Sequence, residues 1–159
     1  MIRSAVISDR SAIEAIAQAI GFEPAEIKTV LSSFDQAFAK NASSNSIWLV
    51  DDDCGIRGLA YTEQERMTEG THNLLLLAVH PSQQQQGRGT ELIKQAERAV
   101  AENGGRILLV ETMTTEEFTH VRRLYERLGF RKEAQIQDFY ADGYDKVIFW
   151  KTIAKRKDR

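Results

Sequence analysis

Two glycines flank an arginine in the segment Gln84–Gly89, which separates an apolar stretch from an amphipathic one. Glycine has no Cβ atom, so phosphate oxygens can approach the backbone closely at Gly87 and Gly89. A loop that enters a helix also presents backbone N–H groups at the positive end of the helix dipole, and Arg88 adds a cation. The segment therefore predicts an anion site for a phosphate-bearing ligand.

Two common phosphate-binding motifs fit this segment poorly. A Walker A loop needs Gly-Lys-Ser/Thr, whereas Gly89 is followed by Thr-Glu. A dinucleotide fingerprint could begin at Gly87 and use Glu111 as its ribose-binding acid, but its third glycine would fall on Leu92, a core position of the helix. Hairpins also precede this strand, where the fingerprint needs the first strand of a βαβ repeat.

The spacing of apolar residues predicts the elements that position this segment. Strands are expected at Ile2–Ile7, Ser46–Asp51, Ile56–Glu63, Asn73–His80, Ile107–Thr112, Arg131–Tyr140 and Lys146–Ile153. Helices are expected from a Ser11–Glu14 capping box to Gly21, from Pro24 along an apolar stripe to Phe38, at Thr90–Glu102 and at Thr119–Leu128, with a loop at Asn41–Asn45. This order predicts an α/β (α+β) fold, with a mixed, mostly antiparallel sheet and helices on both faces.

The composition limits the classes of protein to consider. A chain of 159 residues with 42% hydrophobic residues fits a single domain, which we expect at 1–153 with a charged tail at 154–159. The longest apolar run, Leu74–Val79, is far shorter than the ~20 residues that cross a bilayer, so no membrane span is expected. The single cysteine, Cys54, excludes an internal disulfide, and we expect a cytoplasmic protein. No cluster of residues has metal-ligand spacing, so we expect no metal.

Charge is unevenly distributed along the chain. The net charge of −2 excludes a general attraction to nucleic acid. Residues 1–73 hold 6 Lys and Arg against 11 Asp and Glu, whereas residues 74–159 hold 15 against 12. The basic half suits a polyanionic cofactor and the acidic half a cationic acceptor, although ordinary scatter of surface charge explains the same numbers.

The segment Gln84–Gly89 resembles the Gln/Arg-x-x-Gly-x-Gly/Ala motif of the GNAT superfamily of N-acetyltransferases. Leu77–Pro81 before it resembles the fourth strand of that superfamily and its exit. Tyr125, followed by Gly129 and Phe130, resembles its Tyr-x-x-x-Gly-Phe signature, and the order of elements matches along essentially the whole chain. Many members carry an asparagine seven residues before this tyrosine, where this chain has Phe118.

The resemblance implies an acetyl-CoA site and a mechanism. The pantetheine arm would pair with the backbone around Leu77 and Val79, and the pyrophosphate would bind the amides from Gln84 to Thr90, which include Gln85 and the Gly87-Arg88-Gly89 stretch. The acceptor amine would attack the thioester directly, with the Val79 N–H holding part of the charge of the tetrahedral intermediate. Tyr125 would protonate the departing thiolate as general acid.

The general base is less clearly marked. An amine must lose a proton before it attacks, and Glu111, at the end of an apolar strand, is our first candidate. Glu63, Glu65 and His72 are alternatives, as is a relay through water.

We therefore expect an acetyl-CoA-dependent N-acetyltransferase that acts on a primary amine of a small molecule, since no added module for peptide binding is visible. A protein lysine Nε-acetyltransferase and a non-catalytic acyl-CoA sensor are the alternatives. The last strands of this fold class often form dimers, and Phe149-Trp150 in the final strand makes a homodimer a candidate assembly.

Overall fold

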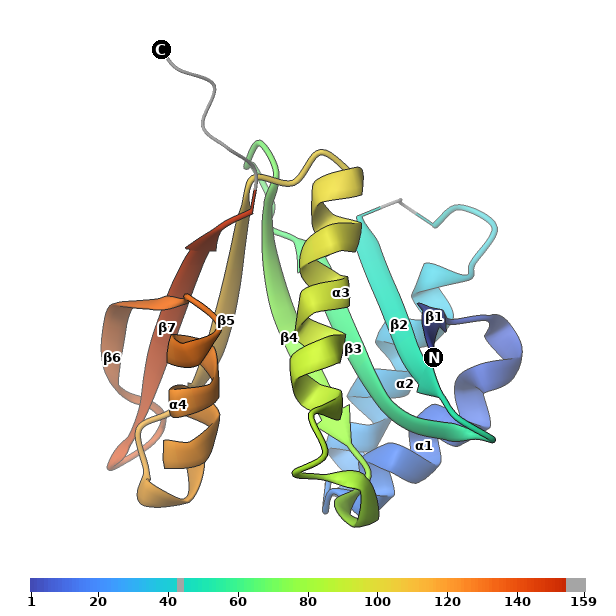
Figure 1. Cartoon of the computed structure of the whole chain (residues 1–159), viewed down its shortest axis with the longest axis horizontal. Helices are drawn as coiled ribbons and strands as arrows, with labels where there is room; N and C mark the ends of the chain where they lie inside the picture. The colour runs from blue at the N-terminus through green and yellow to red at the C-terminus, as the bar shows by residue number, and fades with distance from the viewer. Residues whose placement is uncertain (43–44, 154–159) are drawn as a thin grey trace. The chain divides into compact units, whose positions relative to one another are not determined.

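The computed structural model describes residues 1–42 and 45–153 (Figure 1). The predicted tail at 154–159 and part of the predicted loop at Asn41–Asn45 lie outside the described residues. The elements are β1 (Ile2–Ser4), η1 (Ile7–Asp9), α1 (Arg10–Ala19), α2 (Pro24–Ala37), β2 (Ser46–Asp52), β3 (Ile56–Gln64), β4 (Thr71–Val79), η2 (Pro81–Gln83), α3 (Arg88–Glu102), β5 (Ile107–Met113), η3 (Glu116–Phe118), α4 (Thr119–Arg127), β6 (Arg131–Ala141) and β7 (Tyr144–Thr152). The predicted order of strands and α-helices is confirmed.

The strands follow the order β1-β2-β3-β4-β5-β7-β6. The pairs β1–β2, β2–β3, β5–β7 and β6–β7 are antiparallel, whereas β4 and β5 are parallel. This confirms the predicted mixed, mostly antiparallel sheet. The chain divides into two compact units, of which the first consists of Met1–Glu63 and Leu76–Ala96. The second consists of Gln64–Leu75 and the described residues from Glu97 onward, so β4 and α3 contribute to both units. The single domain at 1–153 stays a prediction.

The core of the first unit forms where α1 and α2 bury their apolar stripes. Ile13 and Phe34 are fully buried, as the helical spacing predicts. The ring of Phe34 meets Trp48 of β2 edge-on, with centroids 5.1 Å apart. Trp48 in turn stacks on Tyr61 of β3 at 4.1 Å, so aromatic contacts tie α2 to the β2–β3 hairpin.

The first helix begins differently from the prediction. The Ser11–Glu14 capping box is wrong, because α1 starts at Arg10 directly after η1. The reason is the Asp9 carboxylate, which accepts the Val6 N–H at 2.8 Å and two hydrogen bonds from the Arg3 guanidinium. Arg3, as the main cause, and the Val6 N–H hold the pKa of Asp9 below its usual value. The chain turns there, which also ends β1 at Ser4 rather than at Ile7.

In the second unit, β5 and β7 have two unlike faces. Along both strands fully buried residues alternate with half-buried ones. The buried face carries Phe149, whose ring lies 5.7 Å from that of Tyr125 on α4, so this is the face that the helix covers. The other face carries Leu109, Glu111 and Lys146, all half-buried.

The position of Phe149 bears on the predicted homodimer. Its side chain is 1% exposed and packs within the core of its own unit, so it does not offer a surface for association. Trp150 is half-buried under the Arg131 guanidinium, which lies 4.7 Å from the ring centroid. The homodimer stays a prediction without the contribution expected from Phe149.

A close approach at Gly58 fixes β3 against its neighbours in the first unit. A Cβ atom at this position would lie 2.9 Å from the Ala78 carbonyl oxygen and 3.1 Å from Leu92 Cδ1. Ala78 precedes the end of β4, and Leu92 is a buried residue of α3. The absence of a side chain at Gly58 therefore lets the first half of α3 pack closely on the strands.

We predict that Gly58→Ala lowers the free energy of unfolding by about 1–3 kcal/mol, because the new methyl group overpacks this contact. Denaturant unfolding monitored by circular dichroism measures the change. Gly89→Ala is the matched control, since a Cβ atom there would meet only a Val79 methyl group at 4.0 Å. Equal stability of the Gly58→Ala variant and the native chain would contradict the prediction.

Candidate functional site

The connection between β4 and α3 is tightly built. Gln83 donates its backbone N–H to the His80 carbonyl at 2.8 Å, and the His80 side chain accepts the Ser82 N–H at 3.2 Å. The side-chain amide of Gln84 donates to the Val79 carbonyl at 3.1 Å, which ties the loop back to the end of β4. These contacts hold the backbone of the loop in place ahead of α3.

Two residues of the loop lie in the left-handed region. Gly87 has a φ of +79°, which glycine adopts without strain, and Gln85 has a φ of +59°, which is uncommon for a residue with a side chain. Left-handed residues in a short loop direct successive backbone N–H groups into one concavity, the arrangement that binds anions. This geometry is compatible with the anion site predicted for Gln84–Gly89.

The start of α3 adds further N–H groups. The helix begins at Arg88, two residues before the predicted start at Thr90, so Arg88, Gly89 and Thr90 form its first turn. Glu91 donates its backbone N–H to the Gly87 carbonyl at 3.0 Å. The N–H groups of the three residues before it are those that a helix leaves without an internal acceptor. They are directed outward at the positive end of the helix dipole.

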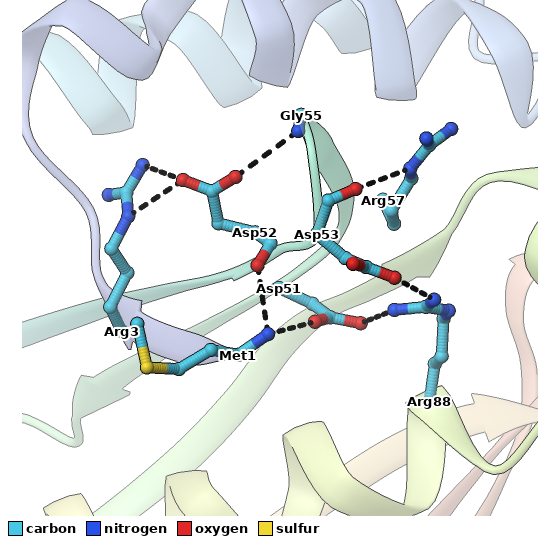
Figure 2. Close-up of polar contacts among 8 residues, drawn as sticks. All are labelled: Met1, Arg3, Asp51, Asp52, Asp53, Gly55, Arg57 and Arg88. Atoms are coloured by element: carbon cyan, nitrogen blue, oxygen red, sulfur yellow. Dashed lines mark hydrogen bonds and ion pairs between the residues drawn. The ribbon is translucent and has the colours of Figure 1, made fainter.

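The guanidinium of Arg88 forms ion pairs within the protein, and its expected part as a cation for phosphate stays a prediction. Its guanidinium forms ion pairs with Asp51 at 2.6 Å and with Asp53 at 2.8 Å (Figure 2). Asp51 is almost fully buried, and its carboxylate would otherwise lack a cation on this side. The hydrogen bond from Arg88 lowers the pKa of Asp53. Arg88 therefore anchors α3 to the end of β2 and the turn after it.

A cavity of about 430 Å³ borders this first turn within the first unit. Its lining includes Gln86, Gly87 and Arg88 from the loop together with Asp51 and Glu91. The lining carries both signs of charge, so it does not by itself indicate which part of a ligand would enter.

We predict that Gly89→Ala separates ligand binding from folding. The position is helical and open, so alanine should leave the free energy of unfolding unchanged or raise it by up to ~1 kcal/mol. A ligand phosphate held against this backbone would meet the new methyl group, and the Kd for acetyl-CoA should rise about tenfold, a loss of ~1.4 kcal/mol. Isothermal titration calorimetry beside thermal unfolding measures both effects. A stable variant with native affinity would show that phosphate does not approach Gly89.

Tyr125 belongs to α4 in the second unit, and its side chain is buried in the core that this helix covers. Its ring contacts those of Phe130 and Phe149, with centroids 5.9 and 5.7 Å apart. Burial raises the pKa of Tyr125 to about 12, so the phenol keeps its proton throughout the neutral range.

The residues after Tyr125 have a structural task of their own. Phe130 donates its N–H to the Tyr125 carbonyl at 3.0 Å, and Gly129, with a φ of +86°, donates to the Glu126 carbonyl at 3.0 Å. This pair of bonds is a Schellman motif that ends α4. The Gly-Phe part of the signature is thus explained by the helix end, whereas the phenol group of Tyr125 is not.

The candidate bases are distributed unequally. Glu111 and Glu65 meet in the second unit, where the Asn73 side-chain nitrogen donates to Glu111 at 3.0 Å and to Glu65 at 3.1 Å. Lys146 forms an ion pair with Glu111 at 2.6 Å. Sequence reasoning missed Asn73 and Lys146, although a lone amide within the apolar strand Thr71–Val79 was a usable signal for Asn73.

The other two candidates have different surroundings. Glu63 is exposed, lies in the first unit and accepts a hydrogen bond from the Tyr61 hydroxyl at 2.7 Å. His72 is buried, and its burial lowers the pKa of the imidazole. A Cβ atom added at Gly105 would lie 3.0 Å from its Nδ1 atom, so His72 packs tightly against the backbone there.

The pairing of β4 with β5 stops part-way along both strands. Parallel pairing joins Thr71–Leu74 to Ile107–Val110, whereas β4 continues to Val79 and β5 to Met113. Glu111 is the first residue of β5 after the paired stretch. Leu77 and Val79, both half-buried, belong to the part of β4 beyond it.

Residues 1–42 and 45–153 contain neither a candidate metal site nor a helix that could span a membrane. No group of three or more His, Cys, Asp and Glu side chains there is arranged to hold a metal ion. The helices in the same part of the chain are all too short or too polar to span a bilayer.

Comparison with known proteins gives the family. The family model of the acetyltransferase (GNAT) domain matches residues 43–132, more than half of the chain. The chain belongs to the GNAT family. It is an N-acetyltransferase, and the predicted superfamily is confirmed. A search of curated proteins finds no match to this sequence.

Solved GNAT structures match nearly the full length of the chain. A GNAT-family structure from Desulfovibrio desulfuricans has a TM-score of 0.90 at 29% identity, covering 97% of this chain and 99% of that chain. The ribosomal-protein-S18-alanine N-acetyltransferase from Escherichia coli has a TM-score of 0.79 at 22% identity, covering 100% and 98%. An aminoglycoside 6'-N-acetyltransferase complexed with coenzyme A has a TM-score of 0.80 at 15% identity, covering 99% of both chains. The last two matches show a shared fold.

Proposed function

We propose that this GNAT protein transfers the acetyl group of acetyl-CoA to a primary amine of a small molecule, by direct attack of the amine on the thioester. The observation that carries the donor half is the first turn of α3. There the N–H groups of Arg88, Gly89 and Thr90 precede the first helical hydrogen bond, behind a loop with left-handed Gln85 and Gly87. Coenzyme A in the complex of a structural relative supports the choice of ligand.

The donor would bind along the end of β4 and the start of α3. Its pyrophosphate would accept hydrogen bonds from the amides between Gln84 and Thr90. Its pantetheine arm would pair with backbone groups of Leu77 and Val79 as an added strand would, because β4 extends beyond its paired stretch with β5.

The chemical step needs two proton transfers. The amine nitrogen forms a bond to the thioester carbon, and the tetrahedral intermediate then loses the thiolate as the C–S bond breaks. Tyr125 would give its phenolic proton to the thiolate sulfur. With a pKa of about 12, the phenol remains protonated at neutral pH until the thiolate forms.

Glu111 would take the proton that the amine loses. Its carboxylate is held in place by the Lys146 ammonium group at 2.6 Å and by a hydrogen bond from the Asn73 side chain at 3.0 Å. Glu65, whose carboxylate accepts a hydrogen bond from the same amide, is the alternative base.

We also propose that the acceptor is a small molecule and that the protein is cytoplasmic, since family membership alone specifies neither. Structural relatives act on an S18 alanine and on aminoglycosides, so the fold serves both protein and small-molecule acceptors. We favour the small molecule because aminoglycosides, the acceptors of one structural relative, are small molecules with amino groups. A protein lysine Nε-acetyltransferase remains the second candidate.

We predict that Tyr125→Phe lowers kcat by about 10²–10⁴, the usual contribution of general acid catalysis, and leaves the Kd for acetyl-CoA unchanged. Release of free thiol with a saturating amine measures kcat, and calorimetry measures Kd. Phenylalanine keeps the ring contacts with Phe130 and Phe149, so folding is the internal control. An unchanged kcat would remove the general-acid role.

The pH dependence of kcat gives a second prediction for this acid. A phenol with the ordinary pKa of ~10 would be half ionised at pH ~10. Because burial raises the pKa of Tyr125, loss of its proton should not lower kcat until the pH approaches about 12. A pH–rate profile up to the onset of unfolding tests this, and a fall in kcat with a midpoint near pH 9 that Tyr125→Phe abolishes would contradict it.

A panel of amines separates the candidate functions. We expect thiol release from acetyl-CoA with small primary amines and little with lysine-containing peptides. Faster turnover with peptides would favour the protein acetyltransferase. Thermal stabilisation by acetyl-CoA without thiol release from any amine would indicate a sensor.

A further inference from the structure

The carboxylates of Glu65 and Glu111 share one amide in the second unit. Asn73 pairs with Leu109 across the parallel β4–β5 ladder, and Glu111 lies two residues further along β5 on the same face. Lys146 pairs with Met113 across β5 and β7, which puts it on this face as well. The register of three strands therefore brings the Glu111 carboxylate, the Asn73 amide and the Lys146 ammonium group to one face, and Glu65 joins them from the connection before β4 through its hydrogen bond with Asn73.

The side-chain oxygen of Asn73 is a buried polar atom of this cluster that lacks a hydrogen-bond partner among the described residues. The Asn73 side chain is 3% exposed, and both of its bonds to the carboxylates use the amide nitrogen. The amide oxygen is buried and accepts no hydrogen bond from the described residues. A buried acceptor without a donor is unfavourable, so the cluster is suited to a ligand that donates hydrogen bonds.

The cluster already holds one alkylammonium group of the chain itself. The Lys146 nitrogen lies 2.6 Å from the Glu111 carboxylate and 4.1 Å from the centroid of the Phe139 ring. A carboxylate on one side and an aromatic face on the other is the usual setting for an ammonium ion in a protein. The Glu65 carboxylate accepts the hydrogen bond from Asn73 but forms no ion pair with a Lys or Arg side chain of residues 1–42 and 45–153, whereas Glu111 pairs with Lys146.

The chemistry of the reaction limits which amino group of an acceptor the Glu65 carboxylate could bind. The amine that attacks the thioester has to be neutral, so it cannot be the group held by charge at the moment of attack. A second ammonium group keeps its charge throughout. We propose that Glu65, held beside Glu111 by the Asn73 amide, binds a second ammonium group of the acceptor, so that the preferred substrates of this N-acetyltransferase are diamines. The inference rests on the proposed function and narrows its substrate class.

The test compares putrescine, a four-carbon diamine, with butylamine, which has the same chain and one amino group. In the native protein kcat/KM for thiol release should be about tenfold higher with putrescine, the size of effect expected of one partly exposed charge pair. Glu65→Gln should abolish this preference, so that kcat/KM becomes equal for the two amines whatever the absolute rate. Loss of a general base would instead lower kcat for both amines and keep their ratio. Glu69→Gln, in the same connection between β3 and β4, is the matched control and should keep the preference.

Binding is measured separately from turnover, so that failure of the diamine site can be distinguished from failure of the proposed acetyltransferase reaction. In the presence of coenzyme A, putrescine should raise the melting temperature of the native protein and of Glu69→Gln, but not that of Glu65→Gln. Equal kcat/KM values for the two amines, or a preference that Glu65→Gln retains, overturns the diamine site and leaves the acetyltransferase intact. If neither amine is turned over, the proposed reaction fails. A rise in melting temperature with putrescine that is lost in Glu65→Gln would then still support the diamine site, and the absence of such a rise would overturn the site as well.

Discussion

The parallel ladder between β4 and β5 is four residues long, and the part of β4 that we propose for the donor lies beyond it. Thr71–Leu74 pair with Ile107–Val110, and β4 then continues to Val79 without this pairing. Backbone groups of a strand need partners, so an unfinished ladder is suited to a ligand that supplies them. The length of this ladder therefore leaves the backbone of Leu77 and Val79 for the proposed pairing with the donor.

Much of the fold could be predicted from the sequence because its signals are local. Apolar spacing, Pro24 at a helix start and the turn after Asp52 all act within a few residues, and the order of elements follows from them. The start of α1 could not be predicted in this way. It depends on Arg3 reaching Asp9 and Asp52 together, and the second of these partners is distant in sequence.

The candidate site shows the same difference between local signals, which could be predicted, and contacts distant in sequence, which could not. The loop with Gly87 and Gly89 and the Tyr125 signature are continuous stretches, so spacing reveals them. The partners of Arg88 come from the end of β2 and the turn after it, and those of Glu111 come from β4 and β7. Such contacts depend on strand register, which one sequence does not specify. A residue type that suggests a role, such as a cation near a phosphate loop, can therefore be engaged in a structural contact.

The pairing of Arg88 with Asp51 and Asp53 also affects how the protein should respond to ionic strength. A ligand phosphate bound by mobile lysines or arginines is released as salt screens the charges. Here the two terminal nitrogens of the guanidinium pair with aspartates within the protein, and the groups that we propose for a phosphate are uncharged backbone amides fixed by a helix. Partly buried ion pairs are themselves screened weakly, so the loop should keep its shape in concentrated salt. We expect a phosphate site of this design to work across a wide range of ion concentrations, with its selectivity set by shape more than by net charge.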